Sequence, residues 1–257
     1  LLAPPCWPAE RDCPLIPPPM LQAQSWPALL EQLLNGTPLT EEQATALMRG
    51  WLDEQIDPVL TGALLAALRA KGVNGVELAA MAQVLREACP LPGARPDLHL
   101  VDTCGTGGDG ADSFNISTAV AFVAAACGAH VAKHGNRAAS SKAGAADTLE
   151  ALGLNLDRAS EQAEATLNDL GLCFLFAQKH HPALAPLAPI RKAIGRRTVF
   201  NLTGPLANPA SVTRQLIGIA RPDFLPVYAE AVSQLGFDNV MLVSGDEPLD
   251  EISVCGP

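Results

Sequence analysis

The sequence lacks several features that mark common classes of protein. Its seven cysteines form no CxxC pair and no cluster with the five histidines, so neither a zinc site nor a disulfide framework is predicted. No apolar run approaches the ~20 residues of a membrane-spanning helix. The first residues do not pair a charged region with an apolar one, as a secretory leader does. These absences favour a reduced, cytoplasmic setting.

Aromatic residues and positive charge are also scarce. Aromatics make up 4% of the chain, and the formal net charge is −10. An acidic chain is not generally attracted to nucleic-acid phosphates or to anionic membranes. We therefore expect small molecules as partners, with no nucleic acid and no membrane. Alanine and leucine dominate instead, which predicts many closely packed helices.

The first third of the chain divides into two segments. Residues 1–20 are dense in proline, which excludes both a helix interior and a central strand, and we interpret them as an extension or linker. Residues 21–92 contain three or four amphipathic helical stretches. One of them opens with Thr40 and Gln43 at the spacing of a capping box. These residues predict a small helical domain.

From residue 93 to 257, short apolar runs alternate with helical segments. We expect strands at "LHLVDTC", "HVAKHG", "CFLFA" and "NVMLVSG". Helices are expected between them, at "AVAFVAAACGAH", "AADTLEALG" and "SEQAEATLNDLG". Strands separated by helices predict an α/β domain with a largely parallel central sheet.

The segment "VDTCGTGGDGADSFNIST" (101–118) places four glycines directly after an expected strand. Glycine lets backbone N–H groups approach an anion that side chains would otherwise keep away. Asn115, Ser117 and Thr118 stand where the next helix begins, so they can hold a second phosphate at its positive end. Glycine turns and polar caps are also ordinary structural features. On this segment alone, structure and function are about equally favoured.

Charged and polar residues follow two other expected strands. "KHGNR" lies at the carboxyl edge of the sheet, where α/β proteins bind ligands. Lys133 can neutralise a departing pyrophosphate, and His134 and Asn136 can orient a polar substrate. Asp250 and Glu251 form an adjacent carboxylate pair suited to Mg²⁺. Each has an ordinary explanation taken singly, as a surface charge, a core histidine or a solvated turn, but their combination with the glycine-rich segment favours function.

The segment "HHPALAPLAPIRKAIGRRTVFNLTGPLANP" adds His181, Arg191 and the turn at Pro205. Arginine binds a carboxylate through a planar fork that lysine cannot copy. Considered alone, each of Arg191, Arg196 and Arg197 is most simply a surface or salt-bridge residue.

These motifs and their order resemble those of the anthranilate phosphoribosyltransferase family, from about Leu21 to the C-terminus. The resemblance rests on "GTGGDG", "FNIST", "KHGNR", "GAADTLEALG", "HHPA", "RKAIGRRTVFN", "GPLANP" and "LDEIS". It implies transfer of phosphoribose from 5-phosphoribosyl 1-pyrophosphate to anthranilate in tryptophan biosynthesis, with Mg²⁺ as cofactor and a homodimer formed through the helical domain. Relatives continue well beyond the position of Glu251, so we expect the C-terminal part of the sheet to be missing.

The resemblance also implies a role for each matching residue. Lys133, Asp250 and Glu251 would be catalytic, and Ser117, Asp250 and Glu251 would hold the metal. The residues implied at phosphoribosyl pyrophosphate are Gly105, Thr106, Gly107, Gly108, Asp109, Ser113, Asn115, Ser117, Thr118, Lys133 and Ala145. Those implied at anthranilate are Gly105, His134, Asn136, His181, Arg191 and Pro205.

Three other interpretations remain open. Pyrimidine nucleoside phosphorylases share the implied fold, but they need neither a carboxylate-binding arginine nor a magnesium pair, so Arg191, Asp250 and Glu251 argue against them. A non-catalytic relative that binds nucleic acid should have a basic groove, which a net charge of −10 disfavours. The third alternative is an inactive fragment.

Overall fold

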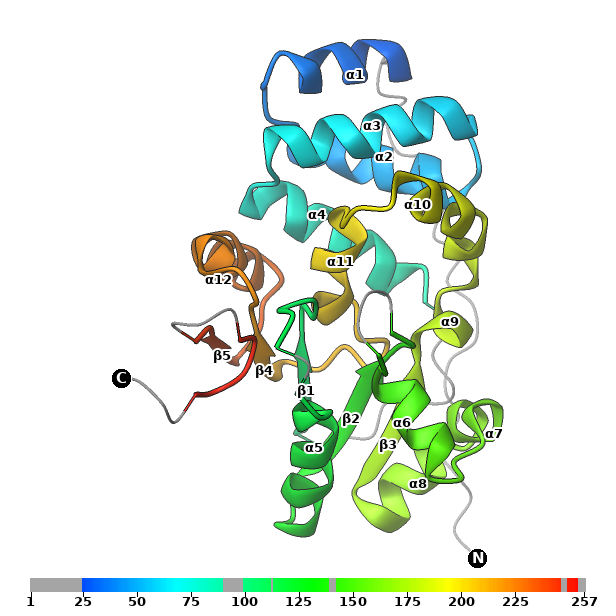
Figure 1. Ribbon diagram of the computed structural model, residues 1–257, viewed down its shortest axis with the longest axis vertical. Helices are drawn as coiled ribbons and strands as arrows, with labels where there is room; N and C mark the ends of the chain where they lie inside the picture. Colours follow the sequence, from blue (N-terminus) through cyan, green and yellow to red (C-terminus); the bar gives the residue numbers. More distant parts are fainter. Residues whose placement is uncertain (1–24, 90–98, 112, 139–141, 246–248, 254–257) are drawn as a thin grey trace, which may run out of the picture.

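The structure, a computed structural model, describes residues 25–89, 99–111, 113–138, 142–245 and 249–253. The proline-rich segment predicted at 1–20 lies outside these residues. Figure 1 shows a layer of helices above a parallel sheet that carries its own helices. None of the described helices is long and apolar enough to cross a membrane.

Four helices form the first part of the described chain. They are α1 (Trp26–Leu34), α2 (Glu41–Leu52), α3 (Pro58–Lys71) and α4 (Gly75–Glu87). A side-chain oxygen caps the N-terminus of each helix, from Ser25, Thr40, Asp57 and Asn74. The capping box predicted at Thr40 and Gln43 is confirmed. Local sequence therefore sets where these helices begin.

Five parallel strands form the sheet, in the order β3-β2-β1-β4-β5. They are β1 (Leu100–Gly105), β2 (His130–Gly135), β3 (Leu172–Phe176), β4 (Arg214–Gly218) and β5 (Asn239–Val243). The predicted α/β class and the strands at β1, β2, β3 and β5 are confirmed. The interior strand β4 is absent from the sequence-based prediction, because it begins with the polar residues Arg214 and Gln215.

Further helices connect the strands or follow them. They are α5 (Ile116–Ala126), α6 (Ala145–Ala151), α7 (Leu156–Glu161), α8 (Ala163–Leu170), α9 (Ala177–His180), α10 (Ala188–Ile194), α11 (Val199–Thr203) and α12 (Leu225–Gln234). The helix predicted at "SEQAEATLNDLG" is observed as α8, but its first two residues belong to α7, because Gln162 leaves helical geometry with φ −101° and ψ 15°. The chain therefore bends between α7 and α8.

Later helices share the core of the first four. Val199, Phe200 and Tyr228 belong to the same buried cluster as Trp51 of α2. The rings of Trp51 and Phe200 lie 5.6 Å apart, and Figure 1 shows α10 and α11 against the helical layer. This shared core holds the helical layer over the carboxyl ends of the strands.

The order of the strands reverses beside β1. From β1 the chain adds β2 and then β3 on one side, and it later adds β4 and β5 on the other. Gly105 at the end of β1 pairs in register with Gly218 at the end of β4. In open α/β sheets, ligands bind outside the carboxyl ends of the strands at such a reversal. The fold therefore predicts a ligand site beyond Gly105 and Gly218.

Candidate active site

A cavity of about 290 Å³ opens at this reversal. The glycine-rich loop after β1, the end of β2 and the acidic segment after β5 line it. Most of the predicted site residues meet here, namely Gly105, Thr106, Gly107, Gly108, Asp109, Ser113, Asn115, Ser117, Lys133, His134, Asn136, Ala145, Asp250 and Glu251.

The glycine-rich loop depends on conformations that favour glycine. Gly107 and Gly108 have φ values of +62° and +70°, in the left-handed region that other residues rarely adopt. Thr106 fastens the start of the loop to β4, because its N–H donates to Gly218 O at 2.8 Å and its Oγ1 accepts from Ala220 N at 3.1 Å. The loop thus leaves β1 in a fixed direction.

The acidic pair bridges the loop and the start of α5. A carboxylate oxygen of Asp250 accepts a hydrogen bond from Gly107 N at 2.7 Å. The backbone N–H of Ser117, in the first turn of α5, acts to lower the pKa of Glu251. Asp250 and Glu251 thus lie next to each other on one wall of the cavity.

Burial and repulsion raise the pKa values of both carboxyls. Burial is the main cause for Asp250, and Asp109 adds to it. Burial first and then Asp250 raise the pKa of Glu251 to about 7, which Lys133 partly opposes. A divalent cation would favour the ionised forms, and carboxylate oxygens are ligands that Mg²⁺ prefers.

The side chains present fit a cation whose coordination is completed by oxygen atoms of the ligand. Among the described residues, no group of three His, Cys, Asp or Glu side chains could hold a metal ion. Mg²⁺ usually binds through one or two carboxylates together with substrate phosphates rather than in an all-protein cage. Asp250 and Glu251 match that pattern, and the hydroxyl of Ser117 lies on the same cavity wall.

We expect magnesium-dependent ligand binding to weaken as the solution is acidified below pH 7. Because the pKa of Glu251 is about 7 in the folded chain, a bound cation must displace a proton at lower pH. Because one proton is displaced, the apparent affinity for the ligand should fall by at most about tenfold for each pH unit. Calorimetric titration of phosphoribosyl pyrophosphate with Mg²⁺ from pH 8 to pH 6 measures it. Glu251→Gln should flatten the profile, and an equally steep profile in that variant would assign the proton elsewhere.

Lys133 forms the floor of the cavity. Its side chain is 3% exposed, and its Nζ donates to Thr103 O at 2.7 Å and Ser117 Oγ at 3.3 Å. Burial lowers its pKa, while the nearby Asp102 raises it. The fully buried Asp102 accepts from Asn208 Nδ2 at 2.8 Å. A fixed cation with a buried counter-charge therefore lies beneath the loop.

His134 lines the cavity, and its ring carries a buried nitrogen, Nε2, without a hydrogen-bond partner among the described residues. Burial, followed by the neighbouring His181, lowers its pKa to about 3, so the imidazole is neutral at neutral pH. A buried polar atom without a partner costs stability unless a ligand or water satisfies it. His134 therefore suits a polar substrate atom.

Arg197 is a cavity residue whose role is not apparent from the sequence. Its guanidinium donates to the carbonyls of Thr106 at 2.5 Å and Gly108 at 3.3 Å, and it lines the cavity together with Asn201. Arg197 follows Gly195, which ends α10 with φ +59° and turns the chain back toward the loop. Gly195 is the only feature of the neighbouring sequence that indicates that Arg197 turns toward the cavity.

Four predicted site residues do not line this cavity among the described residues: Thr118, His181, Arg191 and Pro205. Thr118 is buried on α5 and lines a neighbouring groove with Phe174 of β3. Its hydroxyl donates to Oδ1 of Asn115, which lines the cavity, at 3.4 Å. Its role at phosphoribosyl pyrophosphate stays a prediction.

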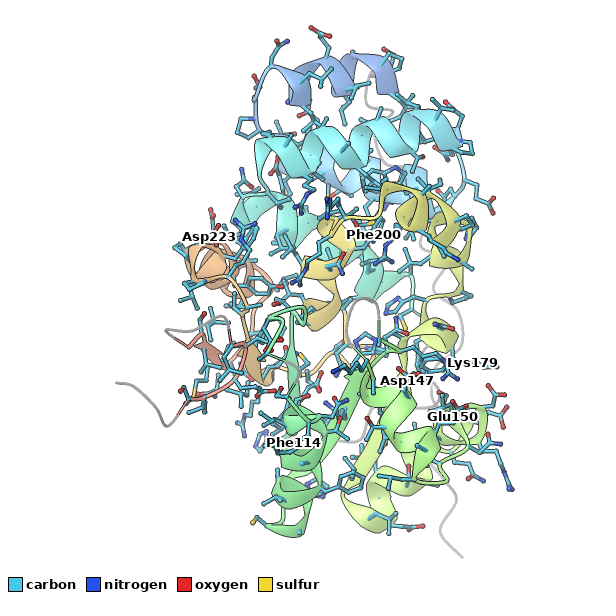
Figure 2. The ribbon with its side chains drawn as sticks, in the orientation of Figure 1. Phe114, Asp147, Glu150, Lys179, Phe200 and Asp223 are labelled. Atoms are coloured by element: carbon cyan, nitrogen blue, oxygen red, sulfur yellow. The ribbon has the colours of Figure 1, made fainter. Side chains whose placement is uncertain are left out.

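The residues expected at anthranilate are divided. His134 and Asn136 line the cavity, whereas the Nε2 of His181 lies 3.1 Å from Ala207 O, behind His134. The guanidinium of Arg191 lies over the ring of Phe200, 5.2 Å from its centre. Figure 2 labels this ring at α11, between the helical layer and the sheet. Only some of the residues expected at anthranilate therefore lie beside the glycine-rich loop.

A methyl group at Gly218 should displace the acidic pair. A Cβ there would overlap the backbone carbonyl of Asp250, so Gly218→Ala must shift the segment that carries both carboxylates. A misplacement of about 1 Å at a reacting centre costs about a hundredfold, and we expect that loss in kcat/KM for the reaction at this site. Gly62→Ala is the control, because its Cβ would meet only Ile190, at 3.8 Å. Equal rates in the two variants would contradict this role of Gly218.

Comparison with known proteins agrees with the geometry. Residues 27–89 match the helical bundle domain of a glycosyl transferase family, and residues 97–257 match the a/b domain of that family. The chain is 60% identical over 235 residues to an anthranilate phosphoribosyltransferase of Synechococcus sp. (strain CC9311), covering 91% of this chain and 68% of the relative. It is 58% identical to one from Novosphingobium aromaticivorans, covering 85% and 66%.

Solved structures of the same enzyme are similar as well. The crystal structure from Thermus thermophilus superposes with a TM-score of 0.81 at 44% identity, covering 87% of this chain and 67% of that one. The enzyme from Saccharomyces cerevisiae in complex with PRPP and Mg has a TM-score of 0.81 at 28% identity, covering 90% and 68%. The chain spans about two thirds of the length of these relatives, and it belongs to the anthranilate phosphoribosyltransferase family.

Proposed function

We propose that the chain transfers the phosphoribosyl group of 5-phosphoribosyl 1-pyrophosphate to anthranilate, in tryptophan biosynthesis. The products are N-(5-phosphoribosyl)anthranilate and pyrophosphate. One observation carries this proposal: a glycine-rich loop, a buried lysine and two adjacent carboxylates with raised pKa values meet in one cavity at the strand-order reversal. That combination suits a polyanion that arrives with a divalent cation.

The reaction needs positioning and charge stabilisation rather than a nucleophilic side chain. The bond between ribose C1 and the pyrophosphate oxygen breaks, and its electron pair leaves with pyrophosphate. The amine nitrogen of anthranilate bonds to C1 and then loses a proton. Bound Mg²⁺ would supply positive charge to the pyrophosphate oxygens. Preorganised groups aimed at developing charge lower such barriers without reorganising.

The chain's own groups divide this work. The glycine-rich loop borders the pyrophosphate at Gly108, since the N–H of Gly107 already donates to Asp250, and Lys133 adds a fixed positive charge below it. Asp250 and Glu251 hold the cation. His134 and Asn136 border the second substrate, so the amine approaches C1 from their side of the cavity.

Arg191 is proposed to take the carboxylate of anthranilate. A lost charge-assisted hydrogen bond is worth about 1.5–3 kcal/mol, so Arg191→Gln should weaken anthranilate roughly tenfold to hundredfold. The affinity for phosphoribosyl pyrophosphate should change little, because Arg191 does not line the cavity of the glycine loop. Separate titrations of the two substrates measure this split. If phosphoribosyl pyrophosphate is the ligand that weakens, the carboxylate role belongs to another residue.

Product analysis separates the proposal from its main rival. A pyrimidine nucleoside phosphorylase would release free base from uridine or thymidine in the presence of phosphate. We expect no free base in that mixture, and phosphoribosyl anthranilate in the mixture of anthranilate, phosphoribosyl pyrophosphate and Mg²⁺, both detected by mass spectrometry. Release of free base without phosphoribosyl anthranilate would favour the phosphorylase.

We further propose a cytoplasmic homodimer that forms through the helical layer. Two large apolar side chains are exposed on neighbouring helices of this layer, Leu34 of α1 at 64% and Val59 of α3 at 83%. Covering apolar surface of this kind favours association. Sedimentation equilibrium should give twice the mass of one chain, and Val59→Glu should shift the equilibrium toward monomer. A monomer at all concentrations would contradict the dimer.

A further inference from the structure

A second cavity, of about 380 Å³, lies between the helical layer and the sheet. Residues of α3, α10 and α11, the turn before α12 and Thr106 of the glycine-rich loop line it. Four arginines face it, Arg69, Arg196, Arg197 and Arg221, and no Asp or Glu of the described residues lines it. In a chain with a net charge of −10, this is a local concentration of positive charge.

Three of these arginines are held in place. Nη1 of Arg69 donates to the carbonyl of Arg197 at 2.8 Å, and Arg197 in turn donates to the glycine-rich loop. Arg221 pairs with Asp223, which Figure 2 labels beside α12, and stacks on Phe224 with its Cζ 4.6 Å from the ring centre. Guanidinium groups fixed in this way bind an anion with little loss of rotamer freedom.

The fixed charges repel one another. Burial lowers the pKa of Arg197 most, and the nearby Arg221 and Arg69 lower it further, while Tyr228 and Asp250 act in the opposite direction. Holding like charges together is unfavourable unless a counter-charge is present. Asp223 pairs with Arg221 from outside the cavity, but no Asp or Glu of the described residues lines the cavity beside Arg69 and Arg196. An anionic ligand would therefore add the counter-charge that the lining itself does not contain.

The rest of the cavity wall is mostly apolar, apart from Thr106, Thr198 and Asn201. Val73, Ile194, Leu202, Ile219 and Phe224 line it. A bare inorganic anion would leave these side chains without a partner, whereas an apolar body would cover them. The guanidinium fork matches the two oxygens of a carboxylate.

We propose that this cavity binds a small organic carboxylate with an apolar body, at a site separate from the phosphoribosyl site. The carboxylate meets Arg196 and Arg221, and the body packs on Ile194 and Ile219. Arg197 lines both cavities, so the occupant lies directly behind the residue that holds the glycine-rich loop.

Calorimetric titration of phenylacetate into the full chain tests the site. Mg²⁺ and pyrophosphate are present at saturation, so that the phosphoribosyl site is filled and turnover plays no part. Phenylacetamide, which lacks the charge, and inorganic phosphate, which lacks the apolar body, are titrated in parallel. The test variant carries Arg196→Gln and Arg221→Gln. Arg49→Gln, at an exposed position of α2, is the control. Arg191→Gln removes the proposed anthranilate contact.

We expect phenylacetate to bind more tightly than either analogue. The double variant should weaken it at least about tenfold, the loss of one charge-assisted hydrogen bond, while Arg49→Gln and Arg191→Gln leave its affinity unchanged. Pyrophosphate binding by the double variant should match that of the unaltered chain. Equal binding of phenylacetamide, loss of binding in Arg191→Gln, or displacement of phenylacetate by pyrophosphate would each overturn the proposal.

Discussion

Replacing Asp250 by Asn and Glu251 by Gln together should lower phosphoribosyl transfer by at least about a thousandfold, or about 4 kcal/mol of barrier. The pyrophosphate is too anionic to be held by one lysine and backbone N–H groups alone, so losing both cation ligands removes binding and charge stabilisation at once. The fold should remain, because the amides keep the volume of the carboxylates and relieve their mutual repulsion. Fluorescence of anthranilate measures the rate, and thermal unfolding measures the fold.

A matched control exists in the same chain. Asp53 and Glu54 are also an adjacent acidic pair, but they are exposed at the end of α2. Asp53→Asn with Glu54→Gln should leave transfer within about twofold, because exposed substitutions away from a site have small effects. Similar losses in both double variants, or unchanged turnover at limiting Mg²⁺, would refute the role given to Asp250 and Glu251.

The second large effect is expected at Lys133. Lys133→Met keeps a chain of similar volume but removes the positive charge beneath the loop, so transfer should fall at least about a hundredfold. Stability should fall as well, by about 3 kcal/mol, because the buried Asp102 loses its counter-charge. Chemical denaturation and the transfer assay measure the two effects separately.

A second substitution separates these two roles of Lys133. Lys133→Met with Asp102→Asn removes both buried charges, so the stability lost should be less than the sum of the losses in the two single variants, while transfer stays low. Lys192→Met, an exposed lysine on α10, is the control and should change neither quantity. Recovery of transfer together with stability would show that Lys133 serves only the fold.

Local signals predict much of this fold. Caps and periodic apolar residues define the helices of the first layer, and apolar runs bounded by glycine define β1, β2, β3 and β5. Strand β4 escapes prediction because Gln215 is polar yet buried, and its side chain donates to the carbonyl of Pro205 at 2.7 Å. A tertiary partner of this kind leaves no trace in hydrophobic periodicity.

The site residues also differ in how far the sequence alone can place them. Residues adjacent to strand ends, such as Lys133 and the glycine-rich loop, can be placed from the sequence because parallel strands end at one edge. Arg197 cannot, because its position depends on how the turn after α10 packs against that loop. The role of Thr118 stays a prediction, because this residue lies beside the cavity rather than in its lining. The role of Arg191 remains a prediction.

The most direct test of the central claim is to quantify pyrophosphate and phosphoribosyl anthranilate in the same reaction. The chain is mixed with anthranilate, phosphoribosyl pyrophosphate and Mg²⁺, and the unaltered chain is compared with the variant that carries Asp250→Asn and Glu251→Gln. Transfer within this cavity requires equal amounts of the two products from the unaltered chain, and almost none of either from the variant. Pyrophosphate released without phosphoribosyl anthranilate, or equal yields from both chains, would contradict it.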